Sequence, residues 1–214
     1  MICLDPQSKE IQVLCKTDLR LAKVVQEVGP ISYSVYSDPF TFLVNTIIGI
    51  GQMLSNKVAD ILTDRFWNLC SKTPQDVSKL SLDKIKSIGI SYSKARYINI
   101  LANEYIKNPY LSDKLQEMSD DNVIDLLTKI PGIGSWTAKM YLIFVLDRKD
   151  VLPYEDGAFN QAFEAVYGIS DNSKGKRLVR DFCKIWHPYS SIAARYLYKY
   201  LDMGFVDKNK KILM

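Results

Sequence analysis

The sequence predicts an all-α protein. Apolar residues recur at helical spacing along most of the 214 residues, which is typical of helices that place one face in a core. Capping residues, prolines and glycines separate these stripes where helices are expected to begin and end. Sustained strand alternation is missing from the sequence, and only residues 11–14 are interpreted as a short strand. The apolar stripes are therefore expected to pack together as helices around a core.

The helices expected in the first half of the chain have clear boundary residues. A helix over residues 18–28 stops at Gly29, which a proline follows. The next helix has Asp38 as its N-cap and Pro39 in its first turn, and it ends near Gly49. Further helices are expected over residues 55–69, 81–86 and 93–107, with a cap and first-turn pair at residues 73–74.

The second half of the chain continues the helical pattern. Residues 150–156 are expected to form a non-helical connection. Helices are expected over residues 122–128, 135–146, 157–167, 176–186 and 191–203.

Residues 127–139 predict a helix end, a tight Gly-x-Gly turn and a new helix start. Pro131 ends the first helix because it has no backbone N–H. Gly132 and Gly134 allow positive φ and leave no Cβ between the backbone and a ligand. Ser135 is expected to be the N-cap of the next helix, so several N–H groups converge on one point.

A phosphate fits at this point, since the N–H donors and the helix dipole both attract an anion. The predicted ligand is the backbone of a nucleic acid, held without readout of its sequence. A net charge of +4 and a pI near 8.7 suit a polyanion partner, although many ordinary proteins share such values. The expected backbone contacts are Gly132, Ile133, Gly134, Ser135 and Thr137.

The sequence lacks the features of membrane and secreted proteins. No apolar run approaches the ~20 residues that span a bilayer. The first ten residues lack a basic start, an apolar stretch and a cleavage site. The protein is therefore expected to be intracellular, in the cytoplasm and nucleoid or in the nucleus, without a membrane partner.

A metal or redox centre is not expected. Cys3, Cys15, Cys70 and Cys183 are far apart and form no Cys-x-x-Cys pair, so they are expected to be free thiols. The one histidine, His187, cannot build a multi-histidine metal site, and no nucleophile-elbow motif supports a serine triad around it. His187 is therefore expected to be a structural residue at a helix end or in a loop.

Five segments together resemble one family of enzymes. They lie at residues 50–55, 73–95, 130–138, 153–156 and 186–191. On these segments the chain resembles the helix–hairpin–helix superfamily of DNA glycosylases, and within it the alkylation-repair branch, the 3-methyladenine DNA glycosylase II family. One such segment would be weak evidence, but five in the right order across residues 36–204 make the resemblance specific.

The resemblance implies a two-lobed helical bundle with the active site in the cleft between the lobes. Residues 38–146 are expected to form the lobe that carries the hairpin. Residues 1–37 are expected to pack with the C-terminal lobe, which comprises the catalytic loop and the helices of residues 147–214.

The resemblance also implies that Asp156 is the catalytic residue. Cleaving a base from deoxyribose builds positive charge on the sugar, and a carboxylate beneath the sugar stabilises that charge. The same group can position or deprotonate the attacking water. Glu155 is the neighbouring carboxylate, and the loop could present either one. Asp156 is also suited to cap the helix that begins at Gly157, and the two roles are compatible.

Position 136 decides the subclass that the resemblance implies. Bifunctional members of the superfamily carry a lysine there, which attacks the sugar as a Schiff-base nucleophile. This chain has Trp136 instead, which implies a monofunctional enzyme that uses water as the nucleophile. Lys139, nearly one helical turn further on, is a weak candidate to replace the missing lysine nucleophile. Trp136 is expected to line the base pocket and stack on an electron-poor base. Its alternative role is that of a core tryptophan between helices.

Further site residues follow from the matching segments. Tyr189 matches a second aromatic residue of the base pocket, and Gln52 is expected near the extruded base or the orphan strand. Tyr92 matches the wedge that fills the gap left by the flipped nucleotide, with an ordinary surface tyrosine as the alternative. Ser190 stands where family members often carry arginine, and Gly157 where some carry an aromatic residue, which leaves the substrate range open.

The function expected from these residues is that of a monofunctional DNA glycosylase acting in base excision repair. It would remove alkylated purines of the 3-methyladenine type from double-stranded DNA as a monomer. No metal or cofactor is expected, apart from a monovalent cation that hairpin carbonyls near Ile130 and Ile133 hold in this superfamily. The alternatives are a glycosylase for oxidised or deaminated purines that uses the same Asp156, and a non-catalytic helix–hairpin–helix DNA-binding protein.

Overall fold

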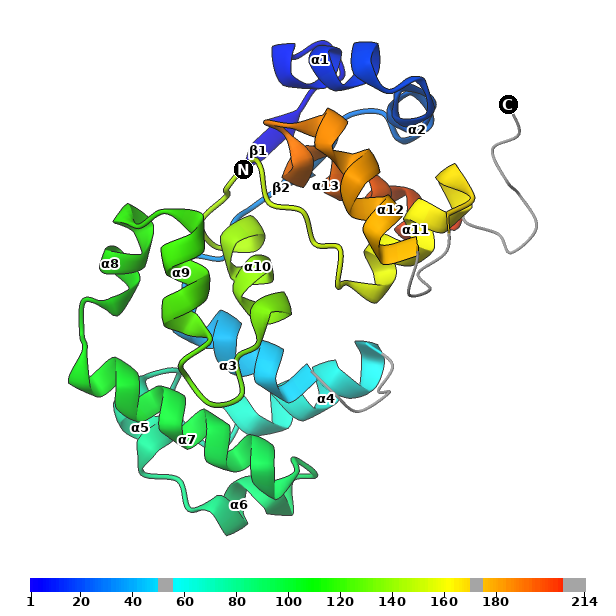
Figure 1. The fold of residues 1–214 in the computed structure, drawn as a ribbon. Helices are drawn as coiled ribbons and strands as arrows, with labels where there is room; N and C mark the ends of the chain where they lie inside the picture. Colours follow the sequence, from blue (N-terminus) through cyan, green and yellow to red (C-terminus); the bar gives the residue numbers. More distant parts are fainter. Residues whose placement is uncertain (50–55, 170–174, 206–214) are drawn as a thin grey trace. The chain divides into compact units, whose positions relative to one another are not determined.

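The computed structural model describes residues 1–49, 56–169 and 175–205. These residues are mostly helical, with one small two-stranded sheet, so the all-α prediction is confirmed (Figure 1). The chain divides into two compact units. The central unit is Tyr36–Leu146, and the terminal unit combines Met1–Val35 with Asp147–Met214.

The central unit consists of helices whose starts follow from capping side chains. Thr73 accepts a hydrogen bond from the Asp76 N–H, and Ser81 accepts one from the Lys84 N–H. Each of these contacts satisfies an N–H group of a first helical turn. The helices are α3 (Pro39–Gly49), α4 (Asn56–Trp67), α5 (Pro74–Ser78), α6 (Leu82–Ser87), α7 (Tyr92–Lys107), α8 (Leu111–Glu117), α9 (Asp120–Leu127) and α10 (Ser135–Phe144). Helix α8 was not among the helices expected from the sequence.

Helix α7 supplies much of the core of the central unit. It packs against α3, α5 and α6, and its residues Ala95, Ile98 and Leu101 are fully buried at three-residue spacing. The ring of Tyr105 lies 5.1 Å from that of Phe40 on α3. This packing fixes the first turn of α7, which carries Tyr92.

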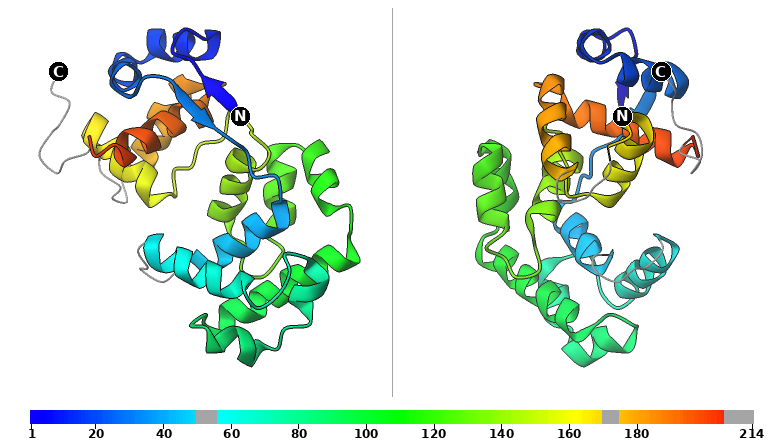
Figure 2. Two further views of the ribbon diagram at one scale, coloured as in Figure 1. Left: turned by 180° about the vertical axis from the view of Figure 1, so that it is seen from behind. Right: turned by 45° about the vertical axis from the view of Figure 1, so that its right-hand side comes forward.

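The terminal unit brings together the two ends of the described chain. Helix α13 packs against both α2 and α11, and α1 contacts η1 (Figures 1 and 2). Strands β1 and β2 pair antiparallel, with Cys3 opposite Ser32. The elements are β1 (Ile2–Leu4), α1 (Lys9–Thr17), α2 (Leu19–Val28), β2 (Ile31–Tyr33), α11 (Gly157–Tyr167), α12 (Gly175–Phe182), η1 (Cys183–Trp186) and α13 (Ser190–Asp202).

The strand expected over residues 11–14 is wrong, because these residues lie inside α1. Ile11 and Leu14 are both buried, at a spacing of three residues that one face of a helix provides. Four residues are too few to distinguish this spacing from strand alternation. None of the described helices is both long enough and apolar enough to cross a membrane.

Candidate nucleic-acid interface and catalytic carboxylate

The hairpin between α9 and α10 is held by backbone hydrogen bonds. The Ile130 N–H donates to the Leu127 carbonyl at 3.0 Å, and the Ile133 N–H donates to the Ile130 carbonyl at 3.1 Å. Gly132 adopts φ +94°, and a Cβ there would lie 2.6 Å from the side chain of Tyr97. The turn therefore requires glycine at position 132, for backbone conformation and for space.

The predicted N-cap of α10 is wrong by one residue. Gly134 is the N-cap, its carbonyl accepts the Ala138 N–H at 3.0 Å, and Ser135 is the first helical residue. Gly134 also has φ −98°, so the expectation of positive φ applies to Gly132 alone. Because Gly134 has no side chain, no side-chain cap covers the exposed start of α10. A helix start without a side-chain cap is the kind of site at which proteins bind anions.

Two expected backbone contacts are limited by burial. The side chains of Ile133 and Thr137 are buried, with Thr137 only 1% exposed, so neither side chain can contact a DNA strand. The Ile133 N–H donates to the Ile130 carbonyl within the turn. The backbone contacts expected from Gly132, Ile133, Gly134, Ser135 and Thr137 stay predictions.

Substitution of Gly132 by alanine is expected to lower the free energy of unfolding by roughly 1–3 kcal/mol. The new methyl group would meet Tyr97 at 2.6 Å, in a backbone conformation that favours glycine. Gly134→Ala is the matched control, since a Cβ at Gly134 meets nothing within 4 Å, and it should cost less than about 1 kcal/mol. Urea unfolding of both variants measures the difference, and equal costs would contradict the packing argument.

The hairpin also contains the carbonyl groups considered for a monovalent cation. The Ile130 carbonyl accepts one hydrogen bond, from Ile133, and a carbonyl oxygen has two lone pairs. The cation therefore stays a prediction that this geometry allows. Among the described residues, no group of three or more His, Cys, Asp or Glu side chains is arranged to hold a metal ion.

Asp156 is the N-cap of α11 in the terminal unit. Its N–H donates to the Pro153 carbonyl at 2.9 Å, and its Oδ1 accepts the Phe159 N–H at 2.8 Å. Phe159 is fully buried, so this contact ties the carboxylate to the core. Asp156 itself is 9% exposed. The helix-capping role is thus present, and it holds the carboxylate in one orientation.

Tyr198 of α13 faces Asp156. Its hydroxyl oxygen is buried, and burial together with the Asp156 carboxylate raises the pKa of Tyr198. The phenol therefore stays neutral and presents a dipole to the carboxylate. Tyr198 could not be predicted from the sequence, because no local pattern relates it to a residue 42 positions earlier.

Glu155, the neighbouring carboxylate, lies in a different environment. Glu155 is partly buried. The burial of the neighbouring Tyr154 and the charge of Glu155 together raise the pKa of Tyr154. The Arg180 guanidinium lies 4.7 Å from the centre of the Tyr154 ring, and Asn160 Nδ2 donates to the Tyr154 carbonyl at 3.0 Å. Glu155 thus belongs to a surface cluster around Tyr154, whereas Asp156 is held by the helix.

Tyr189 and His187 lie at the junction of η1 and α13. Tyr189 is the N-cap residue of α13, its N–H donates to the Trp186 carbonyl at 2.7 Å, and its ring packs partly against the core. His187 follows η1 and precedes Pro188 in a cis peptide bond. Its Nδ1 forms a hydrogen bond with Asp150. His187 therefore has the structural position that the sequence predicts.

The remaining site residues of the central unit are at helix starts. Trp136 is half-buried in the first turn of α10, and Lys139 is half-buried one turn later. Tyr92 begins α7 and is 52% exposed, as a wedge requires. Lys94 Nζ donates to the Ile48 carbonyl at 2.6 Å, and burial lowers its pKa. Gln52, with its matching segment 50–55, lies outside the described residues.

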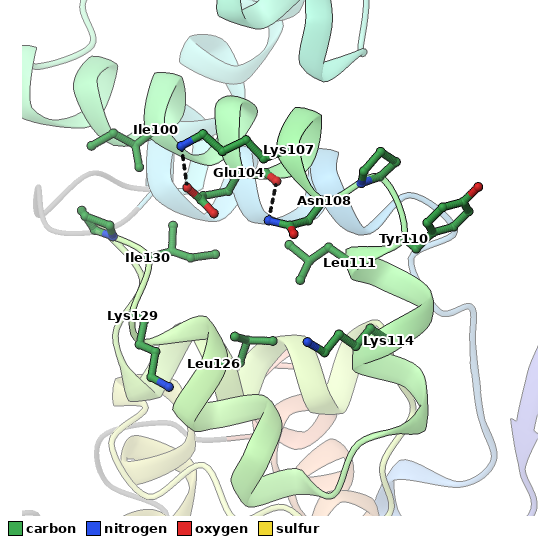
Figure 3. A pocket seen from close by; sticks show the side chains of 12 residues that line it. Ile100, Glu104, Lys107, Asn108, Tyr110, Leu111, Lys114, Leu126, Lys129 and Ile130 are labelled. Carbon is green, nitrogen blue, oxygen red and sulfur yellow. Dashed lines mark hydrogen bonds and ion pairs between the residues drawn. The ribbon is translucent and has the colours of Figure 1, made fainter.

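A pocket of about 590 Å³ adjoins the hairpin within the central unit (Figure 3). Its walls come from α7, α8, α9 and the residues Ile130 and Pro131. Leu126 and Leu111 give it an apolar lining, with Lys114 extending toward it. Trp136, which the sequence predicts in the base pocket, is not among its lining residues.

Comparisons with known proteins agree on one family. The family described as HhH-GPD superfamily base excision DNA repair protein matches residues 48–188. An alkylbase DNA glycosidase-like protein of Schizosaccharomyces pombe is 26% identical, covering 87% of this chain and 90% of the relative. DNA-3-methyladenine glycosylase 1 of the same yeast is also 26% identical, covering 84% of this chain and 80% of the relative.

Solved structures of similar proteins match over nearly the whole chain. The crystal structure of a DNA-3-methyladenine glycosidase from Bacillus halodurans has a TM-score of 0.82 and 28% identity, covering 99% of both chains. The S. pombe 3-methyladenine DNA glycosylase in complex with abasic DNA has a TM-score of 0.81 and 24% identity, covering 91% of this chain and 97% of that one. The second likeness concerns the fold alone.

Proposed function

Because the chain belongs to the HhH-GPD superfamily of base excision DNA repair proteins, we propose that it is a DNA glycosylase for alkylated purines of the 3-methyladenine type. Relatives and a solved structure with that printed activity support the substrate class. The observation that carries the proposal is the fixed carboxylate of Asp156 at the start of α11.

In the proposed reaction, Asp156 acts on the deoxyribose. The glycosidic C–N bond breaks, the base departs with the bonding electrons, and positive charge develops at the sugar. The Asp156 carboxylate stabilises this charge in a water-poor environment. It then orients a water molecule, whose oxygen bonds to the sugar and whose proton passes to the carboxylate or solvent. An alkylated purine that already carries positive charge is a good leaving group and needs little acid catalysis.

The base has to leave the helical stack before this step. Trp136 is proposed to stack on the flipped base, since an aromatic face attracts an electron-poor ring. Tyr189 is proposed as a second aromatic contact, with Glu155 and Gln52 as polar contacts. Tyr92, exposed at the start of α7, is proposed as the wedge. The uncapped first turn of α10 is proposed to bind a backbone phosphate of double-stranded DNA.

The proposed enzyme is monofunctional, because Trp136 stands where lyases carry the lysine nucleophile. Borohydride treatment during turnover of methylated DNA is therefore expected to trap no covalent protein–DNA adduct. Denaturing electrophoresis detects such an adduct as a band of reduced mobility. An adduct that disappears in the Lys139→Ala variant would contradict the water mechanism and identify Lys139 as the nucleophile.

The proposed activity is tested by base release from methylated duplex DNA. Chromatography of the released material should show methylated purines for the wild-type protein and none without protein. Parallel duplexes that contain an oxidised or a deaminated purine test the alternative substrates. Release from these duplexes alone would replace the proposed substrate class, and tight DNA binding without release from any of them would favour the binding protein.

A further inference from the structure

The loop that leads to Asp156 makes a series of contacts with one helix, α13. This loop, residues 147–156, starts at Asp147 after the central unit ends. Arg195 Nη2 of α13 lies 3.2 Å from Asp147 Oδ1, which also accepts the Tyr33 hydroxyl at 2.9 Å. The Arg195 guanidinium in turn stacks on the Tyr33 ring, 3.8 Å from its centre. The start of the loop is thus fixed to α13 by a mostly buried cation.

The middle of the loop is fixed to the first turn of the same helix. The Ser190 hydroxyl donates to Asp150 Oδ1 at 2.6 Å, and the Ser190 N–H donates to the same oxygen at 3.2 Å. The other carboxylate oxygen of Asp150 forms the hydrogen bond with His187. Both oxygens of Asp150 are therefore committed to the start of α13.

The next residue pair extends this attachment. The Ser191 hydroxyl accepts the Val151 N–H at 2.9 Å and donates to the Val151 carbonyl at 3.2 Å. The Ser191 N–H donates to the Lys149 carbonyl at 2.9 Å. Val151 and Ser191 are both buried, so these bonds form away from solvent, where lost hydrogen bonds are costly.

The end of the loop returns to the same helix. Asp156 caps α11, which packs along α13, and it faces Tyr198 eight residues after Ser190. Only four residues lie between Val151 and Asp156. A shift of the loop at Asp150 would therefore be transmitted to the carboxylate over a short and otherwise fixed segment.

We propose that Asp150 is a positioning residue for Asp156, acting through its hydrogen bonds to Ser190 and His187. This inference rests on the proposed function, in which Asp156 acts on the sugar. Asp150 touches no reacting atom, and its role is to hold the loop against α13. Errors of about 1 Å in the placement of a reacting group can cost on the order of 10²-fold in rate. Serine at position 190, where family members often carry arginine, makes this direct contact to Asp150.

The test separates chemistry from binding and from folding. Asp150→Ala and Ser190→Ala are expected to lower the single-turnover rate of base release by about 10-fold or more. The rate is expressed per active molecule, counted by titration with duplex DNA that contains an abasic-site analogue. The affinity for that duplex should stay within about 2-fold of wild type, since the loop supplies no predicted backbone contact. Asp150→Asn, which keeps an acceptor oxygen for Ser190, should restore most of the rate.

Two controls make the result decisive. Glu10→Gln removes the exposed 3.3 Å ion pair between Glu10 and Lys149 of the same loop, and it should leave the rate unchanged. In Asp150→Ala/Ser190→Ala, the loss should be close to that of Asp150→Ala alone, since that substitution already removes the hydrogen bond that Ser190→Ala removes. Wild-type rates in both single variants, while Asp156→Asn is inactive, would overturn the positioning role alone. A wild-type rate in Asp156→Asn would instead overturn the proposed catalytic residue.

Discussion

Asp156→Asn is expected to lower the single-turnover rate of base release roughly 10²–10³-fold, which is the usual loss when one stabilising group is removed from a site of developing charge. Asparagine keeps an oxygen that can accept the Phe159 N–H, now at 2.8 Å from Oδ1. It is also as good an N-cap as aspartate. The variant should therefore remain folded while it loses the negative charge.

The rate is measured with enzyme in excess over methylated duplex DNA, and thermal unfolding of the same preparations checks the fold. Glu155→Gln is the matched control, because it neutralises the adjacent carboxylate without affecting the helix cap. It should lower the rate far less than Asp156→Asn. The reverse order would show that the loop presents Glu155 to the sugar.

The second large effect is expected at Asp18, where asparagine should lower the free energy of unfolding by about 3 kcal/mol. Asp18 is 4% exposed, and its Oδ1 accepts the Arg20 and Leu21 N–H groups at 3.0 Å. Its Oδ2 accepts the Tyr167 hydroxyl at 2.7 Å and the Trp186 Nε1–H at 2.8 Å. An asparagine amide group in place of Oδ2 would direct its N–H groups at the Tyr167 hydroxyl and the Trp186 N–H, which are themselves donors here, in a buried site.

Urea unfolding of Asp18→Asn measures this loss. Asp76→Asn is the control, since Asp76 also lies at the start of a helix but makes exposed contacts, an ion pair with Lys79 and a hydrogen bond from the Thr73 hydroxyl, and its substitution should have little effect. Adding Tyr167→Phe to Asp18→Asn should cost less than Tyr167→Phe costs in the wild-type protein. Independent effects would contradict the buried network.

Asp18 also explains how the terminal unit supports the candidate site. Tyr167, whose hydroxyl donates to Asp18, is the last residue of α11, and Asp156 caps the start of that helix. The Trp186 indole, also bound to Asp18, is fully buried at the end of η1, just before α13. One carboxylate thus links α2, α11 and η1, and Asp156 caps the start of α11.

The sequence predicted most helix boundaries because their signals are local. Asp18, Thr73 and Ser81 cap helices as capping preferences indicate. The N-cap of α10 was wrong because a glycine and a serine stand side by side, and preference alone selects the serine. In the structure, Gly134 occupies that position in an extended conformation.

Contacts between distant residues could not be predicted in this way. Asp18 was expected only within a helix start, and nothing local connects it to Trp186, 168 residues away. Asp150 and Ser190 are 40 residues apart, and their contact depends on how the loop lies against α13. Ser190 was noticed only as a departure from the family pattern.

For the candidate site too, the sequence predicts which residues take part, and their contacts come from the structure. Asp156 followed from the order of motifs, and the structure adds that its carboxylate is fixed by the cap and faces Tyr198. For Trp136, the structure shows a half-buried side chain in the first turn of α10, and its role as a stacking residue stays a prediction.

A structure of this protein bound to duplex DNA with an abasic-site analogue tests the central claim most directly. We expect an Asp156 carboxylate oxygen within about 3.5 Å of the sugar carbon that held the base, a distance suited to reaction. We also expect a backbone phosphate at the N–H groups of the first turn of α10. DNA bound with Asp156 far from that sugar would contradict the proposal that this carboxylate drives base excision.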